Sequence, residues 1–411
     1  MTNAHTSKKV ILILIPILSL IFGFLIEEDL STGGSRIDFI RTFPAVINFS
    51  NFIFNTTHEY TRHFPFHYFL LSIPQNIFNN IFITKLIYFL FSLLLPFLVY
   101  LNISKLYPNQ KFNSFIIGVS LLFLPFYRAS SIWPNAHLTA LIFLLFANYF
   151  YTVNLNSKNF TYKFLNIFFL SLSTYSMQSY AVFFIFYLAH YYKNNSINLF
   201  LSILFFCVLF SFPGFYILLG TSISSKLDFT NNLSYTIVTN FSIIFFCLLF
   251  FLINKNNFIE IKKSIISLKK YEIIMLLLFF SFLLFTYENF SSSGGGFFYK
   301  ISNFIFHNNL FFYLTSFFGL IIFYLLYKID RDIFYIILLV NFTAIGYATS
   351  QKYFEPTLII LIFVLNKNFF SKNLVSSNFN TLIFYMLSFA YFVIALINNN
   401  YELSKSLIIN F

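Results

Sequence analysis

The fold class is decided by residues 10–26, which read VILILIPILSLIFGFLI and carry no charge. Lys8 and Lys9 precede this run, three acids follow it, and no small-residue cleavage site ends it, so we expect a retained first membrane span. Similar runs recur along the 411 residues, of which 58% are hydrophobic and only 9% charged. A soluble domain carries roughly 25% charged residues. The sequence therefore predicts an all-α integral membrane protein.

Thirteen apolar runs are interpreted as transmembrane helices within one polytopic domain, 1–411, without a separate soluble domain. Residues 164–192 are too long for one span and too short for two full ones. We therefore predict two short helices there, broken near residues 174–178, where Ser, Thr and Gln cluster. The expected spans are 10–26, 84–103, 113–127, 137–155, 164–176, 178–192, 198–218, 236–254, 272–287, 309–327, 333–349, 356–370 and 378–397.

The basic residues predict the orientation, because cytoplasmic loops are enriched in Lys and Arg. Placing the N-terminus inside and the C-terminus outside puts 16 of the 25 basic residues in the cytoplasm. The opposite orientation would expose the lysine-rich loop 255–270 outside. The lysines separate apolar runs and form no stripe, so no nucleic-acid partner is expected. The inner residues are Lys8, Lys9, Lys105, Lys111, Lys158, Lys163, Lys193, Lys255, Lys262, Lys263, Lys269, Lys270, Lys328, Arg331, Lys367 and Lys372.

In this orientation, polar chemistry is concentrated on the outer side. Arginine is suited to binding phosphate or carboxylate through two hydrogen bonds. Both cysteines lie in apolar runs, which disfavours disulfides and thiolate metal sites. The outer histidines lack a patterned carboxylate or cysteine partner, and no metal site is expected. The outer side holds four of the five arginines and five of the seven histidines: Arg36, Arg41, Arg62, Arg128, His58, His63, His67, His137 and His307.

The longest polar stretch is the first outer loop, residues 27–83, and long connections are usually functional. Residues 36–54 have helical apolar spacing and predict a helix on the membrane surface. Ser35 is a plausible N-cap with Asp38 at the capping-box position. The two glutamates that open this loop, Glu27 and Glu28, are interpreted as solvated boundary charges. The same interpretation applies to the four inner acids, Glu260, Glu272, Asp330 and Asp332.

Three short motifs, HFPFHY at 63–68, RASSIWPNAH at 128–137 and KYFEP at 352–356, resemble in their order elements of the GT-C glycosyltransferases. Residues 63–68, HFPFHY, resemble the His/Lys-Pro-Pro-Leu-Tyr-Tyr element of protein O-mannosyltransferases, the aminoarabinose transferase of lipid A and family 39-like enzymes. Residues 128–137, RASSIWPNAH, are similar to their Ala-Arg-x-x-x-Pro-Asp element, and residues 352–356, KYFEP, to Arg-Tyr-x-x-Pro. The chain departs from the pattern because Asp38 is followed by Phe39 instead of Glu and because Lys352 replaces Arg.

The resemblance implies an inverting transferase that moves a sugar from a polyprenyl-phosphate donor to an acceptor outside the cytoplasm. It implies a carboxylate as the base on the acceptor hydroxyl, cations that hold the phosphate and an apolar groove for the lipid tail. Divalent-metal dependence stays open. The implied base is Asp38, with Asp29 in reserve; the implied substrate-binding residues are Arg62, His63, Tyr68, Arg128, Lys352 and Tyr353.

Simpler structural roles compete with these assignments. Asp38 could cap a helix, Arg128 and Lys352 could reach lipid headgroups as single basic residues at span ends do, and Arg62 could be a surface residue. His67 and His137 could be interfacial packing residues. The run SSSGGG at 291–296 lacks the Lys-Ser/Thr of a phosphate-binding loop and is read as a linker.

Two other classes remain as alternatives. An O-antigen-type polymerase or ligase is disfavoured because such proteins place their large outer loops late in the chain. A transporter or flippase would carry ionisable residues within spans and repeated halves. Here the span interiors hold almost no ionisable groups, and the two halves show no repeat. Partners are expected to be membrane lipid and a lipid-linked sugar. We expect the chain in a bacterial inner membrane with its active face outward.

Overall fold

The computed structural model describes residues 2–31, 34–49, 63–157, 159–220, 233–287, 296–343 and 351–409. Within these ranges all regular structure is α-helix or short 3-10 helix, and no strand occurs. The predicted all-α class is therefore confirmed. The chain divides into two compact units, which are described separately. Unit one comprises Met1–Leu227 with Tyr385–Phe411, and unit two comprises Asp228–Phe384.

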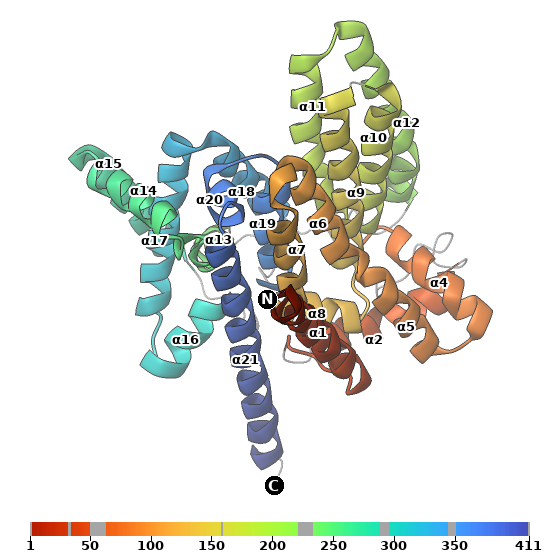
Figure 1. Cartoon of the computed structure of the whole chain (residues 1–411), viewed down its shortest axis with the longest axis horizontal. Helices are drawn as coiled ribbons and strands as arrows, with labels where there is room; N and C mark the ends of the chain where they lie inside the picture. The colour runs from red at the N-terminus through yellow and green to blue at the C-terminus, as the bar shows by residue number, and fades with distance from the viewer. Residues whose placement is uncertain are drawn as a thin grey trace. The chain divides into compact units, whose positions relative to one another are not determined.

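Unit one begins with α1, which continues through the first apolar run and ends before Glu27. The described residues that follow form α2 and α4, and a set of further helices comes after them. Within this set, α9, α10 and α12 pack as neighbours (Figure 1). The helices of unit one are α1 (Thr2–Leu25), α2 (Gly34–Ile47), α4 (Phe66–Phe78), α5 (Ile81–Ser92), α6 (Leu94–Leu106), α7 (Lys111–Ser120), α8 (Pro125–Ile132), α9 (Ala136–Ser157), α10 (Phe160–Ser176), α11 (Phe183–Asn194) and α12 (Ile197–Gly220).

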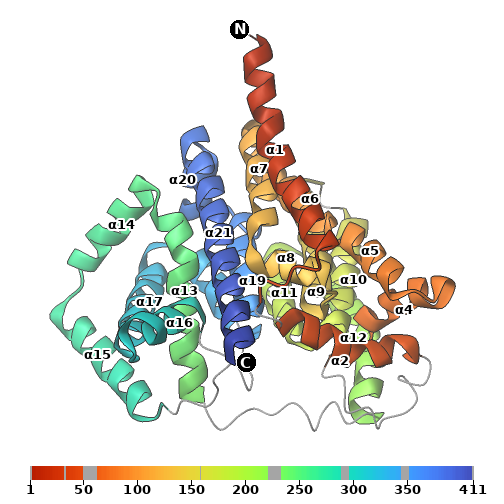
Figure 2. The ribbon, with the colours of Figure 1, turned by 90° about the horizontal axis from the view of Figure 1, so that it is seen from below.

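Unit two is built around α13, which is largely buried and packs against α17 and α19. Helices α14 and α15 lie at the rim of this unit (Figure 2). Helix α21 starts in unit two and continues into unit one. The helices are α13 (Leu233–Leu252), α14 (Lys255–Ile266), α15 (Lys270–Phe285), α16 (Gly296–Phe306), α17 (Leu310–Ile329), α18 (Arg331–Thr343), α19 (Gln351–Val364), α20 (Phe369–Val375) and α21 (Asn378–Ile409).

Several long apolar helices indicate an integral membrane protein. Among the described residues, six helices are long and apolar enough to cross a membrane, and two bent helix pairs would raise this number to eight. Of the other predicted spans, 113–127 and 356–370 fall in the bent pairs, and 10–26 contains the shorter apolar helix Ile11–Leu25. The six are Ile81–Leu106, Ala136–Leu155, Ile197–Ile217, Leu233–Leu252, Leu310–Ile329 and Asn378–Asn399.

Helix breaks are partly as predicted. The expected break within 164–192 is present, because α10 ends at Ser176 and a 3-10 turn leads into α11. Near this end, Thr174 and Ser176 donate their hydroxyls to carbonyls one turn back, a bond that weakens a helix. The span expected at 356–370 is wrong as one straight helix. It bends by 77° after Val364, where the chain turns into α20.

The start of α2 corrects a second prediction. Ser35 was expected to cap this helix, but it lies inside the helix. The Ser31 hydroxyl accepts the Ser35 backbone N–H at 2.7 Å, and Asp29 accepts the Arg36 N–H at 2.8 Å. Ser31 and Asp29 of the preceding turn therefore accept backbone N–H groups at the start of α2. Asp38 lies further along the helix.

Candidate functional site

A buried ion pair lies in the turn after α1, where Glu27 and Glu28 contact α5 and α8. This region of unit one is called the corner below. Glu28 binds the Arg128 guanidinium through two hydrogen bonds, 2.7 Å from Nε and 2.9 Å from Nη2. Arg128 is fully buried and also donates to the Ser19 carbonyl at 2.9 Å. Fork-shaped pairing of this kind fixes both side chains. The interpretation of Glu28 as a solvated charge is wrong, as is the suggestion that Arg128 reaches lipid headgroups.

A second ion pair in the same corner involves a lysine that the sequence analysis placed inside a span. Lys85 of α5 is 3% exposed and lies 2.8 Å from Glu27. Its ammonium lies 3.6 Å from the centre of the Trp133 ring, and the Trp133 indole N–H donates to the Glu28 carbonyl at 3.2 Å. The hydrogen bond from Lys85 lowers the pKa of Glu27. Trp133 thus joins the two ion pairs.

The two candidate bases, Asp29 and Asp38, have different surroundings. One oxygen of Asp29 accepts from the backbone N–H and the hydroxyl of Ser31, and the other accepts the Arg36 N–H. Asp29 is nearly buried and holds the turn before α2. Asp38 is half-exposed on α2, and its backbone carbonyl accepts the Thr42 hydroxyl at 2.9 Å. Asp29 is thus held within its turn, whereas Asp38 is half-exposed.

A buried hydrogen-bonded network links the HFPFHY segment to the start of α9. His67 Nδ1 lies 2.8 Å from the Thr139 hydroxyl, which is 3.1 Å from the Tyr88 hydroxyl. Tyr88 also donates to the Asn135 carbonyl at 2.8 Å. Burial, and to a lesser extent the neighbouring His63, lowers the pKa of His67 to about 3. The imidazole is therefore neutral at physiological pH and tied into the protein interior.

Of the other predicted residues of the first two motifs, Tyr68 and His137 are also buried, whereas His63 is half-buried. The Asn135 side chain accepts the His137 N–H at 2.9 Å, and His137 Nε2 lies 2.9 Å from the Tyr180 hydroxyl. Tyr68 is 1% exposed, and its ring packs against the His67 ring. The interpretation of His67 and His137 as interfacial residues is wrong, because both lie in the interior.

Sequence reasoning missed three residues of this region: Lys85, Tyr88 and Thr139. A signal was present in α5, where polar residues recur every three to four positions and so share one helix face. All of them are buried. The stripe is Thr84, Lys85, Tyr88 and Ser92.

The remaining predicted residues fall elsewhere. Arg62 lies outside the described residues. Lys352 and Tyr353 belong to α19 of unit two and are half-exposed, with the Lys352 ammonium 4.9 Å from the Tyr353 ring centre. Unit one thus contains Asp29, Asp38, Arg128 and the histidine motif, whereas the Lys-Tyr pair is part of the other unit.

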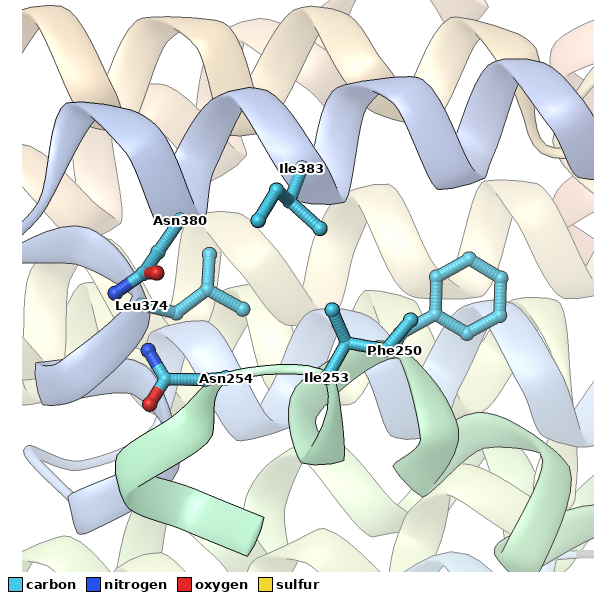
Figure 3. A pocket seen from close by; sticks show the side chains of 6 residues that line it. All are labelled: Phe250, Ile253, Asn254, Leu374, Asn380 and Ile383. Atoms are coloured by element: carbon cyan, nitrogen blue, oxygen red, sulfur yellow. The ribbon is translucent and has the colours of Figure 1, made fainter.

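Unit two has a small pocket that is lined by four apolar side chains and two asparagines (Figure 3). Asn254 and Asn380 lie at one end of it, and both donate their side-chain amides to the Asn373 carbonyl, at 3.2 and 3.1 Å. These amides join the start of α14 and of α21 to α20, so their role is structural. The other lining residues are apolar: Phe250, Ile253, Leu374 and Ile383.

No group of three or more His, Cys, Asp or Glu side chains in the described ranges is arranged to hold a metal ion. The geometry on which a function can be based is the corner of unit one, with its two ion pairs and Trp133, against which Arg36 and Phe39 of α2 pack. The chain matches no protein-family model, no curated protein and no solved structure.

Proposed function

We propose that this chain is a membrane glycosyltransferase of the GT-C type, which transfers a sugar from a polyprenyl-phosphate donor to an acceptor on the non-cytoplasmic side. The proposal includes the 13-span topology with the N-terminus inside. One observation carries it: three separate sequence segments that resemble GT-C motifs or their acidic loop pack within one unit. Glu28 bonds Arg128 and Trp133, and His67 bonds Thr139.

In the proposed reaction, the acceptor hydroxyl attacks the anomeric carbon of the sugar. The Asp38 carboxylate takes the hydroxyl proton as the new C–O bond forms. The bond from the anomeric carbon to the phosphate oxygen breaks, and polyprenyl phosphate leaves with the electron pair. Attack from the face opposite the phosphate inverts the configuration. Asp38 is proposed for this role because Asp29 already uses both oxygens within its turn.

We propose different roles for the residues that were expected to bind the phosphate. Arg128 is saturated by Glu28 and the Ser19 carbonyl, so we assign it to positioning the corner around the base. Lys352, Tyr353 and Arg62 remain the proposed contacts to the phosphate. His63 and Tyr68 remain proposed substrate-binding residues, and the burial of Tyr68 limits its direct contact with a ligand.

The test compares membranes that contain the natural chain or Asp38→Asn. Both are incubated with a panel of radiolabelled polyprenyl-phosphate hexoses and aminosugars, and loss of label from the lipid is measured. We expect Asp38→Asn to lower transfer at least about a hundredfold at normal expression, because general-base catalysis contributes roughly 10² to 10⁴. Glu260→Gln, a change at an exposed acid of unit two, is the matched control and should retain full transfer.

Full activity of both Asp38→Asn and Asp29→Asn would remove the assignment of the base. No transfer by the natural chain from any donor of the panel would count against the whole class.

A further inference from the structure

Helix α14 of unit two has a lysine-rich surface that the proposed reaction does not use. The buried side of this helix is narrow: Asn257 and Ile261, one turn apart, face the neighbouring helices. Asn254 caps the helix by accepting the N–H groups of Asn256 and Asn257. The helix is therefore fixed to α13, α17 and α20, while most of its surface is exposed.

The exposed surface combines apolar and basic side chains. Phe258 is 55% exposed and Ile266 is 73% exposed. Ile265 lies two turns after Phe258 and so shares its face, with Lys262 between them on the same side. Five lysines between residues 255 and 270 are exposed, against the single acid Glu260. They are Lys255, Lys262, Lys263, Lys269 and Lys270.

A second feature marks the same end of unit two as a membrane–water boundary. Glu272 at the start of α15 binds Lys328 at the end of α17 and accepts the Tyr324 hydroxyl at 2.8 Å. The ammonium of Lys328 lies 5.0 Å from the Tyr324 ring, and that of Lys269 lies 5.7 Å from the ring of Tyr271. Paired aromatic and basic residues at helix ends are typical of headgroup level. Glu272 is 4% exposed, so its interpretation as a solvated charge is wrong.

From these features we infer that α14 lies on the membrane surface and binds anionic phospholipid headgroups. Its apolar side chains would enter the boundary between headgroups and acyl chains, and its lysines would bind lipid phosphates. Charge complementarity selects an anionic lipid over a zwitterionic one. The inference does not depend on catalysis, and it assigns to these lysines a role beyond orienting the chain.

The test uses the full chain in nanodiscs, with Cys207 and Cys247 replaced by Ala and an environment-sensitive fluorophore on Ile266→Cys. We expect its emission to shift to the blue as phosphatidylglycerol replaces phosphatidylcholine, and salt to weaken the shift. Each lysine near an anionic surface contributes on the order of fivefold in affinity. Lys262→Gln with Lys263→Gln should therefore abolish the response over the same lipid range.

The matched control is Lys105→Gln with Lys111→Gln, which removes two exposed lysines of unit one and should leave the response unchanged. The same emission in both lipids would overturn the inference and point to an acidic protein as the partner of α14. A lipid response that survives in the Lys262/Lys263 variant would also overturn it, because the apolar face alone would then drive binding.

Discussion

At the scale of single residues, the Glu28–Arg128 pair has the clearest energetic consequence. Both side chains are buried, and their two hydrogen bonds satisfy each other's charge. Arg128→Ala leaves a buried carboxylate without its counterion, a loss that typically costs about 3–5 kcal/mol. We expect a much lower midpoint of thermal unfolding in detergent.

A double-mutant cycle separates this charge effect from lost packing. Glu28→Ala with Arg128→Ala removes both charges, so it should be less damaging than the sum of the two single variants. Arg128→Lys should also be unstable, because an ammonium cannot form the two-pronged bond. Lys105→Ala, at an exposed site, serves as the control. Additive effects in the cycle would show that the pair is not coupled.

At the scale of helices, His67 connects α4 to α9, and its titration should loosen this contact. Burial lowers its pKa from 6.5 to about 3, so between these values the unfolded chain binds more protons than the folded one. The stability that neutral, buried His67 contributes to the folded protein is present in full above pH 6.5 and is lost as the pH falls towards 3. At pH 5 the expected loss is about 2 kcal/mol.

The measurement is the unfolding midpoint of the purified protein at pH 7.5 and pH 5. His67→Gln can still hydrogen-bond to Thr139 but does not titrate, so its midpoint should fall less between the two conditions. An equal fall in the natural chain and in this variant would assign the acid sensitivity to other groups.

Helices that depend on local sequence patterns could be predicted, whereas contacts between residues further apart in the chain could not. Apolar runs and the polar cluster near Ser176 are local properties, so α9, α12, α13 and the break after α10 could be predicted. The capping of α2 could not, because Ser35 fits the local pattern of a cap, whereas Asp29 captures the Arg36 N–H from seven residues away.

The site shows the same limit. Acids, arginines and histidines near one another in the loop 27–83 could be recognised from the sequence. The pairing of Glu28 with Arg128, and of Glu27 with Lys85, joins residues far apart in the chain and requires packing to be known. Lys85 was not predicted as a site residue, because a lysine at the edge of an apolar run indicates the end of a span. The polar face of α5 on which it lies is buried, which makes it an interior residue.

At the scale of the whole molecule, the topology depends on whether the shorter helices cross the membrane. Helix α15 has 16 residues, which span about 24 Å, against a hydrocarbon core of about 30 Å. Its exposed apolar side chains suit lipid, and a bilayer can thin locally to match a short helix. If α15 crosses, the lysine-rich α14 and the following α16 lie on opposite sides of the membrane.

Single cysteines placed on either side of α15 test this directly. In a Cys207→Ala/Cys247→Ala background, an impermeant maleimide should label Ser267→Cys only in inside-out vesicles and Asn303→Cys only in right-side-out vesicles. Both positions are exposed, so access is governed by the membrane and not by burial. Labelling of both from one side would mean that α15 does not cross. The helices after α15 would then be inverted, and Lys352 would lie on the cytoplasmic side, away from any donor phosphate bound outside.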